Sequence, residues 1–503
     1  RWDTSSFGHR SPTADLERMG RPTILPIQAS TEETGVNPRS ATREPTHKAG
    51  RDGWSPTSWR DRIEAQQIRY PDRAAVDLAA EKLASLPPLV TSYEIEQLKA
   101  EFAEAQAGRR LVLQGGDCAE TLGDCRPDVI TAKLKILLQM SLVLIHGGRR
   151  PVTRVGRFAG QYAKPRSSPT ERGVHDGQEL ELPSYFGDLV NRAEFTPEAR
   201  EPDPHLMVRG YQHAAMTLNF IRSLVDGGFA DAHHPEHWDL RFMEHAGLTH
   251  RRREQYERLS RTIADGLAFM EALGEGQVEG LQRVEFFTSH EGLNLIYESA
   301  QTRRVPRRPG WYDLTTHMPW IGERTRQLDG AHVEFFRGIA NPVGVKIGPK
   351  ADPAEVVSLV ERLNPSAEPG KIALIARMGV KNVSPALPPI LEAVAGAGQP
   401  VLWMCDPMHG NGIQTAGGVK TRDFDDIHAE LEATMDAHKS VGTWLGGLHF
   451  ELTGEDVTEC IGGAHAIGED DLHANYASPC DPRLNYQQSL ELAFLLANRL
   501  SSG

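Results

Sequence analysis

The most informative stretch of the chain reads Asn341-Pro-Val-Gly-Val-Lys-Ile-Gly-Pro349. Its apolar residues Val343, Val345 and Ile347 alternate with two glycines and Lys346. Successive side chains of a strand point to opposite faces, so the pattern places Lys346 among glycines on one face. Taken alone, this stretch favours two interpretations equally: a functional cation facing a cavity, or a charge on an edge strand that discourages aggregation.

The residues before this strand predict a short helix. Ala331, Phe335 and Ile339 recur at a spacing of four and share one helical face. Asp329 precedes them as a candidate N-cap. Pro342 then ends the helix, because proline has no amide hydrogen and disfavours helical backbone in the residue before it.

Short apolar runs alternate with helical patterns along most of the chain. We expect eight strands, at Leu111–Gln114, Pro151–Val155, Val284–Thr288, Tyr312–Thr315, Val343–Ile347, Ile372–Ala376, Val401–Met404 and Leu448–Leu452. Eight strands that are mostly followed by helices predict an α/β protein with a (β/α)8 TIM barrel. A nucleotide-binding open sheet is disfavoured, because no GxGxxG or P-loop motif follows any of these runs.

Composition divides the chain into three parts. Residues 1–50 are rich in Ser, Thr, Pro and Arg without a clear period, which predicts a mobile N-terminal tail. Residues 51–106 have helical patterns and form a predicted N-terminal helical extension. Residues 107–503 contain the predicted strands and form the catalytic barrel.

The interval between the second and third predicted strands is too long for one helix, and we expect an inserted helical hairpin at about residues 200–275. Its first arm is amphipathic from Met207 to Val225 and is capped by Asp203. Its second arm runs from about Arg253 to Leu273. An insertion of this size is typical of a contact with a partner subunit or of a regulatory site.

Overall composition excludes several classes of protein. With 39% hydrophobic and 24% charged residues and no apolar run near the ~20 residues that span a bilayer, the chain is expected to be soluble, with no membrane partner. A net charge of -13 argues against nucleic-acid binding. Five cysteines without a CxxC pair favour a reducing compartment. We expect the cytoplasm, with a plastid or another organelle as the alternative if the tail is a transit-peptide remnant.

Chemically capable side chains follow the predicted strands, where (β/α)8 enzymes place their active sites. One set comprises Cys118, His409, Glu451 and Asp481, which offer one sulfur, one nitrogen and two carboxylates. This mixture suits a divalent transition metal such as Mn²⁺, Co²⁺, Fe²⁺ or Zn²⁺. Each residue also has a purely structural interpretation: a small buried thiol, a core or loop histidine, a surface carboxylate and a turn cap.

A second set of strand-end residues is cationic, and its members are Arg157, Lys164, Arg166, Arg324, Lys346 and Arg377. Arginine binds phosphate and carboxylate groups bidentately, and lysine adds a compact charge or an acid. A metal beside such a set indicates a small phosphorylated substrate with a carbonyl group to polarise. The alternative is a group of solvated loop charges.

Seven strings resemble the class II (plant-like) 3-deoxy-D-arabino-heptulosonate 7-phosphate (DAHP) synthases. They are Leu113-Gln-Gly-Gly-Asp-Cys118-Ala-Glu120, Ala159-Gly-Gln-Tyr-Ala-Lys164-Pro-Arg-Ser167, Trp320-Ile-Gly-Glu-Arg-Thr-Arg-Gln-Leu-Asp-Gly-Ala-His332, Asn341-Pro-Val-Gly-Val-Lys346, Cys405-Asp-Pro-Met-His409-Gly-Asn411, Leu452-Thr-Gly-Glu-Asp-Val-Thr-Glu-Cys-Ile-Gly-Gly463 and Cys480-Asp-Pro-Arg-Leu-Asn-Tyr-Gln-Gln-Ser-Leu-Glu-Leu-Ala-Phe494. The resemblance runs from about Trp54 to Leu500 in one register, and none of the strings is low-complexity. The tail and the Arg-rich loop Arg303–Arg308 depart from the pattern.

The resemblance implies condensation of phosphoenolpyruvate with erythrose 4-phosphate and water to DAHP and phosphate, the first step of the shikimate pathway of aromatic biosynthesis. It implies a divalent metal, above all Mn²⁺ or Co²⁺, on Cys118, His409, Glu451 and Asp481. The residues that match the phosphoenolpyruvate site are Arg157, Lys164, Glu323, Arg324, Lys346 and Arg377, of which Lys164, Lys346 and Arg377 are the candidate catalytic residues. Arg166 and Ser167 match the residues that bind erythrose 4-phosphate in this family.

Two alternatives stay open at this point. One is a secondary-metabolism homologue that uses an amino-sugar phosphate in place of erythrose 4-phosphate. The other is a catalytically idle, metal-binding regulatory subunit, against which the intact ligand set and Lys346 argue. The resemblance also leads us to expect a homo-oligomer and feedback inhibition by aromatic amino acids.

Overall fold

The computed structural model describes residues 53–226, single helical positions between 250 and 265, and residues 285–502. The predicted tail and most of the second arm of the predicted hairpin lie outside these residues. The described chain contains a closed barrel of parallel strands in the order β1-β14-β11-β10-β9-β8-β5-β2. Its strands are β1 (Leu111–Gly116), β2 (Val152–Arg157), β5 (Phe286–Glu291), β8 (Met318–Ile321), β9 (Val343–Ile347), β10 (Ile372–Ala376), β11 (Leu402–Cys405) and β14 (Leu445–Glu451).

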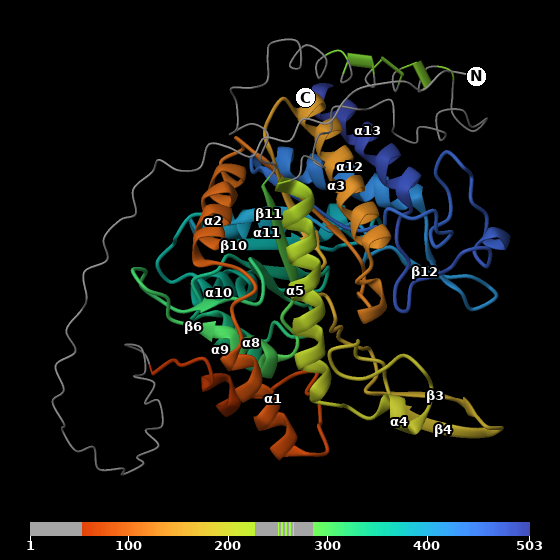
Figure 1. Ribbon diagram of the computed structural model, residues 1–503. Coiled ribbons are helices and arrows are strands. Elements are labelled where there is room, and N and C mark those ends of the chain that lie inside the picture. The colour runs from red at the N-terminus through yellow and green to blue at the C-terminus, as the bar shows by residue number, and fades with distance from the viewer. Residues whose placement is uncertain are drawn as a thin grey trace, which may run out of the picture. The chain divides into compact units, whose positions relative to one another are not determined.

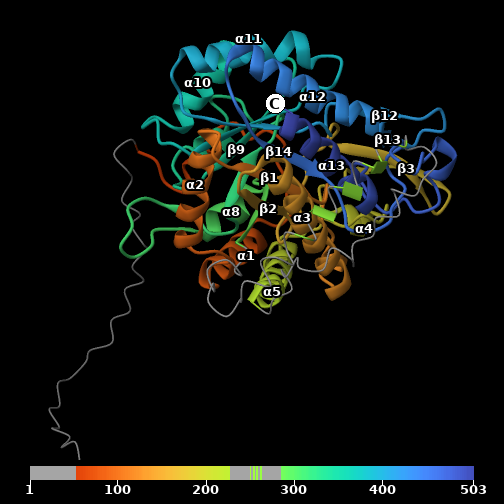
Figure 2. The same ribbon diagram turned by 90° about the horizontal axis from the view of Figure 1, so that it is seen from above.

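Helices surround the barrel, as the view from above shows (Figure 2). They are α3 (Pro127–Gly148), α5 (His205–Asp226), α8 (Leu295–Gln301), α9 (Ala331–Phe336), α10 (Pro353–Leu363), α11 (Val383–Gly396), α12 (Phe424–Val441) and α13 (Tyr486–Ser502). The predicted TIM barrel is confirmed. Strand β9 has the predicted alternation: Val343, Val345 and Ile347 pack in a cluster with the outer helices, and Lys346 takes the opposite, inner face.

The fourth strand of the barrel differs from the prediction. It is β8, Met318–Ile321, which pairs in parallel with β5 and β9. The predicted run at Tyr312–Thr315 contributes β7 (Tyr312–Asp313), which pairs antiparallel with β6 (Thr302–Arg303) outside the barrel. The true strand has four residues and contains Pro319, which lacks a donor for the ladder, so its sequence carried no clear strand signal.

The helix before β9 is also shorter than predicted. It ends at Phe336, and its N-cap is Gly330, with no side-chain cap from Asp329. The amide of Ala331 donates to the carbonyl of Ile63, so a distant segment satisfies this helix end instead. Ala331, Phe335 and Ile339 are all buried, but Ile339 lies beyond the helix end, so the predicted helical face is right only for Ala331 and Phe335.

The N-terminal extension is helical, as predicted, with η1 (Ser58–Asp61), α1 (Arg73–Ser85) and α2 (Ser92–Gln106). Helix α2 closes one end of the barrel. Its Leu98, Phe102 and Ala105 pack in one cluster with inward-facing strand residues such as Val112 and Ile375. This apolar cluster fills the end of the barrel where the strands begin. The carboxyl ends of the strands are left for chemistry.

Helix α3 is apolar and helix α5 is amphipathic, and both pack on the chain itself. Helix α3 is long and apolar enough to cross a membrane by composition, yet 67% of its most apolar window is buried, and it packs on α13. Helix α5 begins with Asp203 accepting from the His205 amide, so the predicted cap is confirmed. Met207, Tyr211, Ala214 and Leu218 are buried in a cluster with residues of α1 and α8, and Ile221 is buried in the cluster that contains α3. The ribbons of α1, α5 and α8 are labelled in Figure 1.

Short ribbons and turns complete the loops at the carboxyl ends of the strands. The hairpin of β3 (Thr170–His175) and β4 (Gln178–Pro183) follows β2 and extends away from the barrel (Figure 1). The ribbon of β12 (Gly412–Gln414) and β13 (Lys420–Arg422) follows β11. Other short helical turns among the described residues are η2 (Leu122–Asp124), α4 (Pro197–Arg200) and η6 (Glu469–Asp471).

Candidate active site

A polar pocket with a cavity volume of about 120 Å³ opens at the carboxyl ends of the strands. Its lining residues are Lys164, Pro165, Arg166, Ser167, Glu291, Gly322, Glu323, Arg324, Lys346, Arg377, His409, Lys420 and Asp481. Nine of the twelve predicted site residues are in this lining. The other three, Cys118, Arg157 and Glu451, are buried beside it and contact lining residues or one another.

Three predicted metal ligands form one cluster. Ligand atoms of Cys118, Glu451 and Asp481 all lie within 4.8 Å of one another. Strands β1 and β14 are neighbours with Gly116 paired to Glu451, so Cys118 follows directly after the end of β1 at the same level. Asp481 comes from the loop before α13, and its amide donates to the Cys118 sulfur at 3.2 Å.

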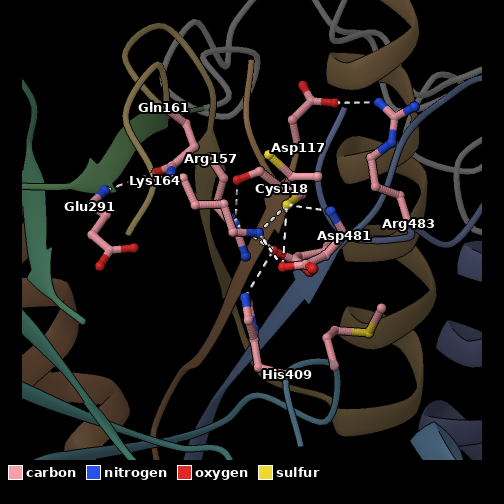
Figure 3. A network of polar contacts seen from close by, with 12 residues as sticks. Asp117, Cys118, Arg157, Gln161, Lys164, Glu291, His409, Asp481 and Arg483 are labelled. Atoms are coloured by element: carbon pink, nitrogen blue, oxygen red, sulfur yellow. Dashed lines mark hydrogen bonds and ion pairs between the residues drawn. The ribbon is translucent and has the colours of Figure 1, made fainter. Parts of the chain in front are cut away.

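Ion pairs beside the cluster hold this loop against β1. Arg483, two positions after Asp481, donates to Asp117 Oδ1 at 2.7 Å, and Asp117 is the neighbour of Cys118 (Figure 3). Lys133 of α3 contacts the other oxygen of the same carboxylate. Because all three side chains are buried, they fix the spacing of the two ligand-bearing segments.

The fourth predicted ligand, His409, approaches the same cluster (Figure 3). Its Nδ1 donates to Asp406 Oδ2 at 2.7 Å, and its Nε2 lies 3.0 Å from Glu451 Oε1. Burial lowers the pKa of His409, and the neighbouring Asp406 and Glu451 act in the opposite direction. In the neutral ring with its hydrogen on Nδ1, Nε2 carries a lone pair and faces a carboxylate oxygen. Two acceptors at this distance fit a shared cation, and a histidine oriented by a carboxylate is a frequent metal ligand.

Lys164 brings its own positive charge to the donor set. Its Nζ contacts both the Cys118 sulfur and Asp481 Oδ2, and it lies 3.6 Å from Glu451 Oε1. Although burial opposes the charge, Asp481 and Cys118 raise the pKa of Lys164 well above its usual value. A buried ammonium thus already pairs with the donor set.

Lys346 and Arg157 lie over the same aromatic ring. The Lys346 ammonium and the Arg157 guanidinium are 5.7 and 5.3 Å from the centre of the Trp320 ring. Lys346 Nζ also donates to Asp406 Oδ2 at 2.6 Å, and burial lowers the pKa of Lys346 to about 8. The interpretation of Lys346 as an interior cation is thus favoured over that of an edge-strand charge, because β9 has barrel neighbours on both sides.

The remaining predicted site residues line the pocket. Arg377 donates to the His409 carbonyl at 2.7 Å, and Arg166 pairs with Glu171 at 2.9 Å. Arg324 and Ser167 are part of the lining. Glu323 accepts from the Gly348 amide at 2.7 Å, which ties the loop after β8 to the end of β9.

Three functional neighbours were not singled out from the sequence. Asp406 orients both Lys346 and His409. In the sequence it stands three residues before His409, within one of the strings that carry the resemblance. Arg422 of β13 pairs with Glu451 Oε2 at 2.7 Å, and Glu291 lines the pocket. No local pattern marks Arg422, because the short β12–β13 ribbon has no strand periodicity and its place follows from the tertiary fold.

Comparison with known proteins gives one consistent result. The model of the "Class-II DAHP synthetase family" matches residues 54–497. The chain is 47% identical over 462 residues to a phospho-2-dehydro-3-deoxyheptonate aldolase of Neurospora crassa, covering 89% of this chain and 94% of the relative. It is 48% identical over 440 residues to the Streptomyces coelicolor protein of the same name, covering 88% and 96%. It is 47% identical over 423 residues to the aldolase AroG of Mycolicibacterium smegmatis, covering 83% and 89%. The chain therefore belongs to the class-II DAHP synthetase family.

Proposed function

We propose that this protein condenses phosphoenolpyruvate with erythrose 4-phosphate and water, forms DAHP and releases inorganic phosphate, and that it needs a divalent metal to do so. Family membership supports this reaction, which is the first step of the shikimate pathway. The observation that carries the proposal is one pocket in which a sulfur, nitrogen and oxygen donor set adjoins a group of cations.

The cations of the pocket match the carboxylate and phosphate of phosphoenolpyruvate. The residues assigned to this substrate are Arg157, Lys164, Glu323, Arg324, Lys346 and Arg377. Guanidinium groups bind both kinds of anion bidentately, and an ammonium adds a compact charge. As phosphate leaves C2, the same cations stabilise the negative charge that develops on it.

Arg166 and Ser167, at the edge of the pocket, are assigned to the phosphate of erythrose 4-phosphate. C3 of phosphoenolpyruvate attacks the aldehyde carbon, water adds to C2, and the bond from C2 to the phosphate oxygen breaks. Of the two protons that the water gives up, one leaves with the phosphate and the other replaces the proton taken up by the aldehyde oxygen. The aldehyde oxygen needs a proton as it becomes a hydroxyl. Lys346 Nζ can supply it, because its pKa of about 8 lies near neutral pH.

We assign the metal to Cys118, His409, Glu451 and Asp481, with Mn²⁺ or Co²⁺ as the expected ion. One sulfur, one nitrogen and two carboxylates suit a first-row divalent metal. When bound, such a metal supplies a Lewis acid that polarises the aldehyde oxygen.

The test is release of phosphate from phosphoenolpyruvate, measured with and without erythrose 4-phosphate. Chelation should abolish turnover, and Mn²⁺ or Co²⁺ should restore it. Full activity in protein shown by elemental analysis to be metal-free would reject the ligand assignment. Turnover with an amino-sugar phosphate but not with erythrose 4-phosphate would support the alternative substrate, and no turnover with either would support a regulatory subunit.

A pair of cysteine variants separates ligand loss from general damage. Cys118→Ser should reduce the bound metal and turnover together, because an alcohol is a weaker ligand than a thiolate for these ions. Cys125→Ser is the matched control, since Cys125 donates to the His213 carbonyl and is not in the ligand cluster. Equal metal content in both variants would contradict the assignment of Cys118.

Regulation, assembly and compartment are further parts of this proposal. Aromatic amino acids are expected to bind outside the pocket and lower turnover, and deletion of residues 1–50 should weaken inhibition more than catalysis. Inhibition that is strictly competitive with substrate would contradict this. We also propose a homo-oligomer in the cytoplasm, and the five free cysteines support that compartment.

A further inference from the structure

A chain of buried hydrogen bonds crosses the barrel just below the pocket and both starts and ends on β2. Ser289 of β5 donates to the Gly156 carbonyl at 3.2 Å, and Gln114 Nε2 of β1 donates to Ser289 Oγ at 2.9 Å. Gln114 Oε1 lies 2.7 Å from His449 Nδ1 of β14. His449 Nε2 in turn lies 2.8 Å from Nη1 of Arg157, the residue after Gly156.

The position of every proton in this chain follows from the arginine. A guanidinium group can only donate, so His449 Nε2 must accept from Arg157. A neutral imidazole then carries its hydrogen on Nδ1, which donates to Gln114 Oε1. This fixes the Gln114 amide with its nitrogen toward Ser289 Oγ, and the Ser289 hydroxyl hydrogen points to a backbone carbonyl. Each of the four hydrogen bonds then joins one donor to one acceptor.

The surroundings favour this arrangement over any other. Gln114, Ser289 and His449 have no exposed surface, so water does not compete for their hydrogen bonds. The His449 ring packs edge-to-face with Trp320 at 5.5 Å between ring centres, which limits its rotation.

A neutral acceptor has an electrostatic advantage at this position. Arg157 Nη2 faces Glu451 Oε1 at 3.1 Å, so one carboxylate already offsets part of the guanidinium charge. A second carboxylate in place of His449 would hold the guanidinium equally well, but it would cancel the charge that an anionic substrate needs. The buried Arg157 Nε has no hydrogen-bond partner in the described part of the chain, so a donor is left for a ligand.

We propose that His449 and Gln114 are positioning residues for phosphoenolpyruvate, and that they hold the Arg157 guanidinium toward the substrate through a neutral imidazole with its hydrogen on Nδ1. This inference rests on the proposed function, because that function assigns Arg157 to phosphoenolpyruvate. Neither residue touches the substrate.

The test compares three substitutions at His449 in the metal-loaded enzyme. His449→Phe keeps the ring but removes the acceptor, and it should raise the KM for phosphoenolpyruvate about 10- to 100-fold, the range expected for loss of a charge-assisted hydrogen bond. The KM for erythrose 4-phosphate should change less than about threefold. His449→Gln can reach Arg157 with its amide oxygen and should restore most of the affinity. His449→Asn is too short to reach Arg157 and should behave like His449→Phe.

His438→Phe is the matched control. His438 is also a buried histidine packed edge-on to a tryptophan, Trp403, at 5.8 Å between ring centres. It is not in the pocket lining, so its loss should leave both KM values unchanged. An equal rise in KM for phosphoenolpyruvate in this control would mean that general loosening of the barrel causes the effect, and it would overturn the proposal.

One spectroscopic readout and one outcome of the kinetic test decide the remaining cases. Nitrogen-15 NMR of histidine-labelled protein should show an Nδ1–H tautomer that disappears in His449→Asn, and an Nε2–H tautomer at this residue would overturn the proton assignment. Wild-type KM for phosphoenolpyruvate in both His449→Phe and His449→Asn would overturn the positioning role. These outcomes are distinct from failure of the proposed function, in which the wild-type enzyme itself has no turnover.

Discussion

Lys346 is a buried cation that donates to Asp406, and Asp406 has other hydrogen-bond donors as well. Its Nζ donates to Asp406, which also accepts from the Met408 and His409 amides and from the His409 ring. Burial lowers the pKa of Lys346 to about 8, so the folded protein does not favour its charge. The side chain is therefore better suited to chemistry than to stability.

We predict that Lys346→Met lowers kcat by about a hundredfold or more, the usual effect of removing a general acid or base. The thermal melting temperature should stay within a few degrees of the wild type, because Asp406 keeps three hydrogen-bond donors. Steady-state kinetics and a melting curve measure both quantities. Lys381→Met, at an exposed lysine of the loop after β10, is the control. A Lys346→Met protein that does not fold would instead favour a structural role for this lysine.

At the scale of elements, helix α12 connects two loops of the pocket. Glu430 Oε1 accepts from the Met378 and Gly379 amides at 2.9 and 2.8 Å, directly after Arg377. Glu430 Oε2 accepts from Asn411 Nδ2 at 2.7 Å, two residues after His409. One carboxylate of the outer helix layer thus fixes a substrate-binding loop and a metal-binding loop against each other.

Replacing Glu430 with Gln should disturb both loops at once. The Asn411 amide cannot turn over, because its oxygen accepts from the Val380 amide and its nitrogen donates to the Pro407 carbonyl. The new glutamine side chain would therefore either place a second N–H donor against Asn411 or lose the two backbone amides. We predict a loss of about 1–3 kcal/mol in the free energy of unfolding, the cost of an unpaired buried polar group.

The same Glu430→Gln variant should bind metal and phosphoenolpyruvate several-fold more weakly, since both loops shift. Chemical denaturation, metal titration and KM values measure these effects. Glu432→Gln removes a partly exposed carboxylate of the same helix and should change none of them. A stability loss with unchanged metal and substrate affinity would show that Glu430 acts on the fold alone.

Helix α12 also contains a histidine that should affect stability in acid. Burial lowers the pKa of His438 from 6.5 to about 4. The unfolded chain therefore binds a proton between pH 6.5 and 4 that the folded protein does not bind, so the free energy of unfolding falls as the pH drops through this window. A difference of about 2.5 pKa units corresponds to about 3 kcal/mol at the acid end.

His438→Gln should remove this contribution to the pH dependence. The difference in unfolding free energy between variant and wild type should shift by up to about 3 kcal/mol in favour of the variant from about pH 7 to about pH 4. Denaturant unfolding across this range measures it. The exposed His473→Gln variant should keep the wild-type slope. A slope that is the same in all three proteins would contradict burial of a neutral His438.

At the scale of the whole molecule, the proposed metal site joins distant parts of the chain. Its four ligands follow β1, follow β11, end β14 and precede α13. A metal held by the folded protein alone stabilises it by mass action, by about 4 kcal/mol when the free ion is about a thousandfold above its Kd. We predict a higher melting temperature with Mn²⁺ than with chelator, and a smaller difference in Asp481→Asn. Identical melting in both conditions would contradict a metal that bridges these segments.

Local sequence determined much of this architecture. Strand β9 was predicted with its true bounds, because alternating apolar residues and the proline before them act within a few positions. Strand β8 was missed, because Met318–Ile321 is short and contains a proline. Its place in the barrel depends on hydrogen bonds to β5 and β9, which no local pattern encodes.

The candidate site divides in the same way. The sequence by itself, through its motifs and the family resemblance, named the ligand and substrate residues, because the carboxyl ends of all barrel strands meet at one rim. Only the tertiary structure revealed what orients them. Gln114 and His449 are 335 positions apart and meet because β1 and β14 close the barrel as neighbours, and the protons they share are fixed by Arg157 of a third strand. Hydrogen bonds of this kind form between side chains that only the closed fold brings within reach, so their pattern is absent from the order of residues along the chain.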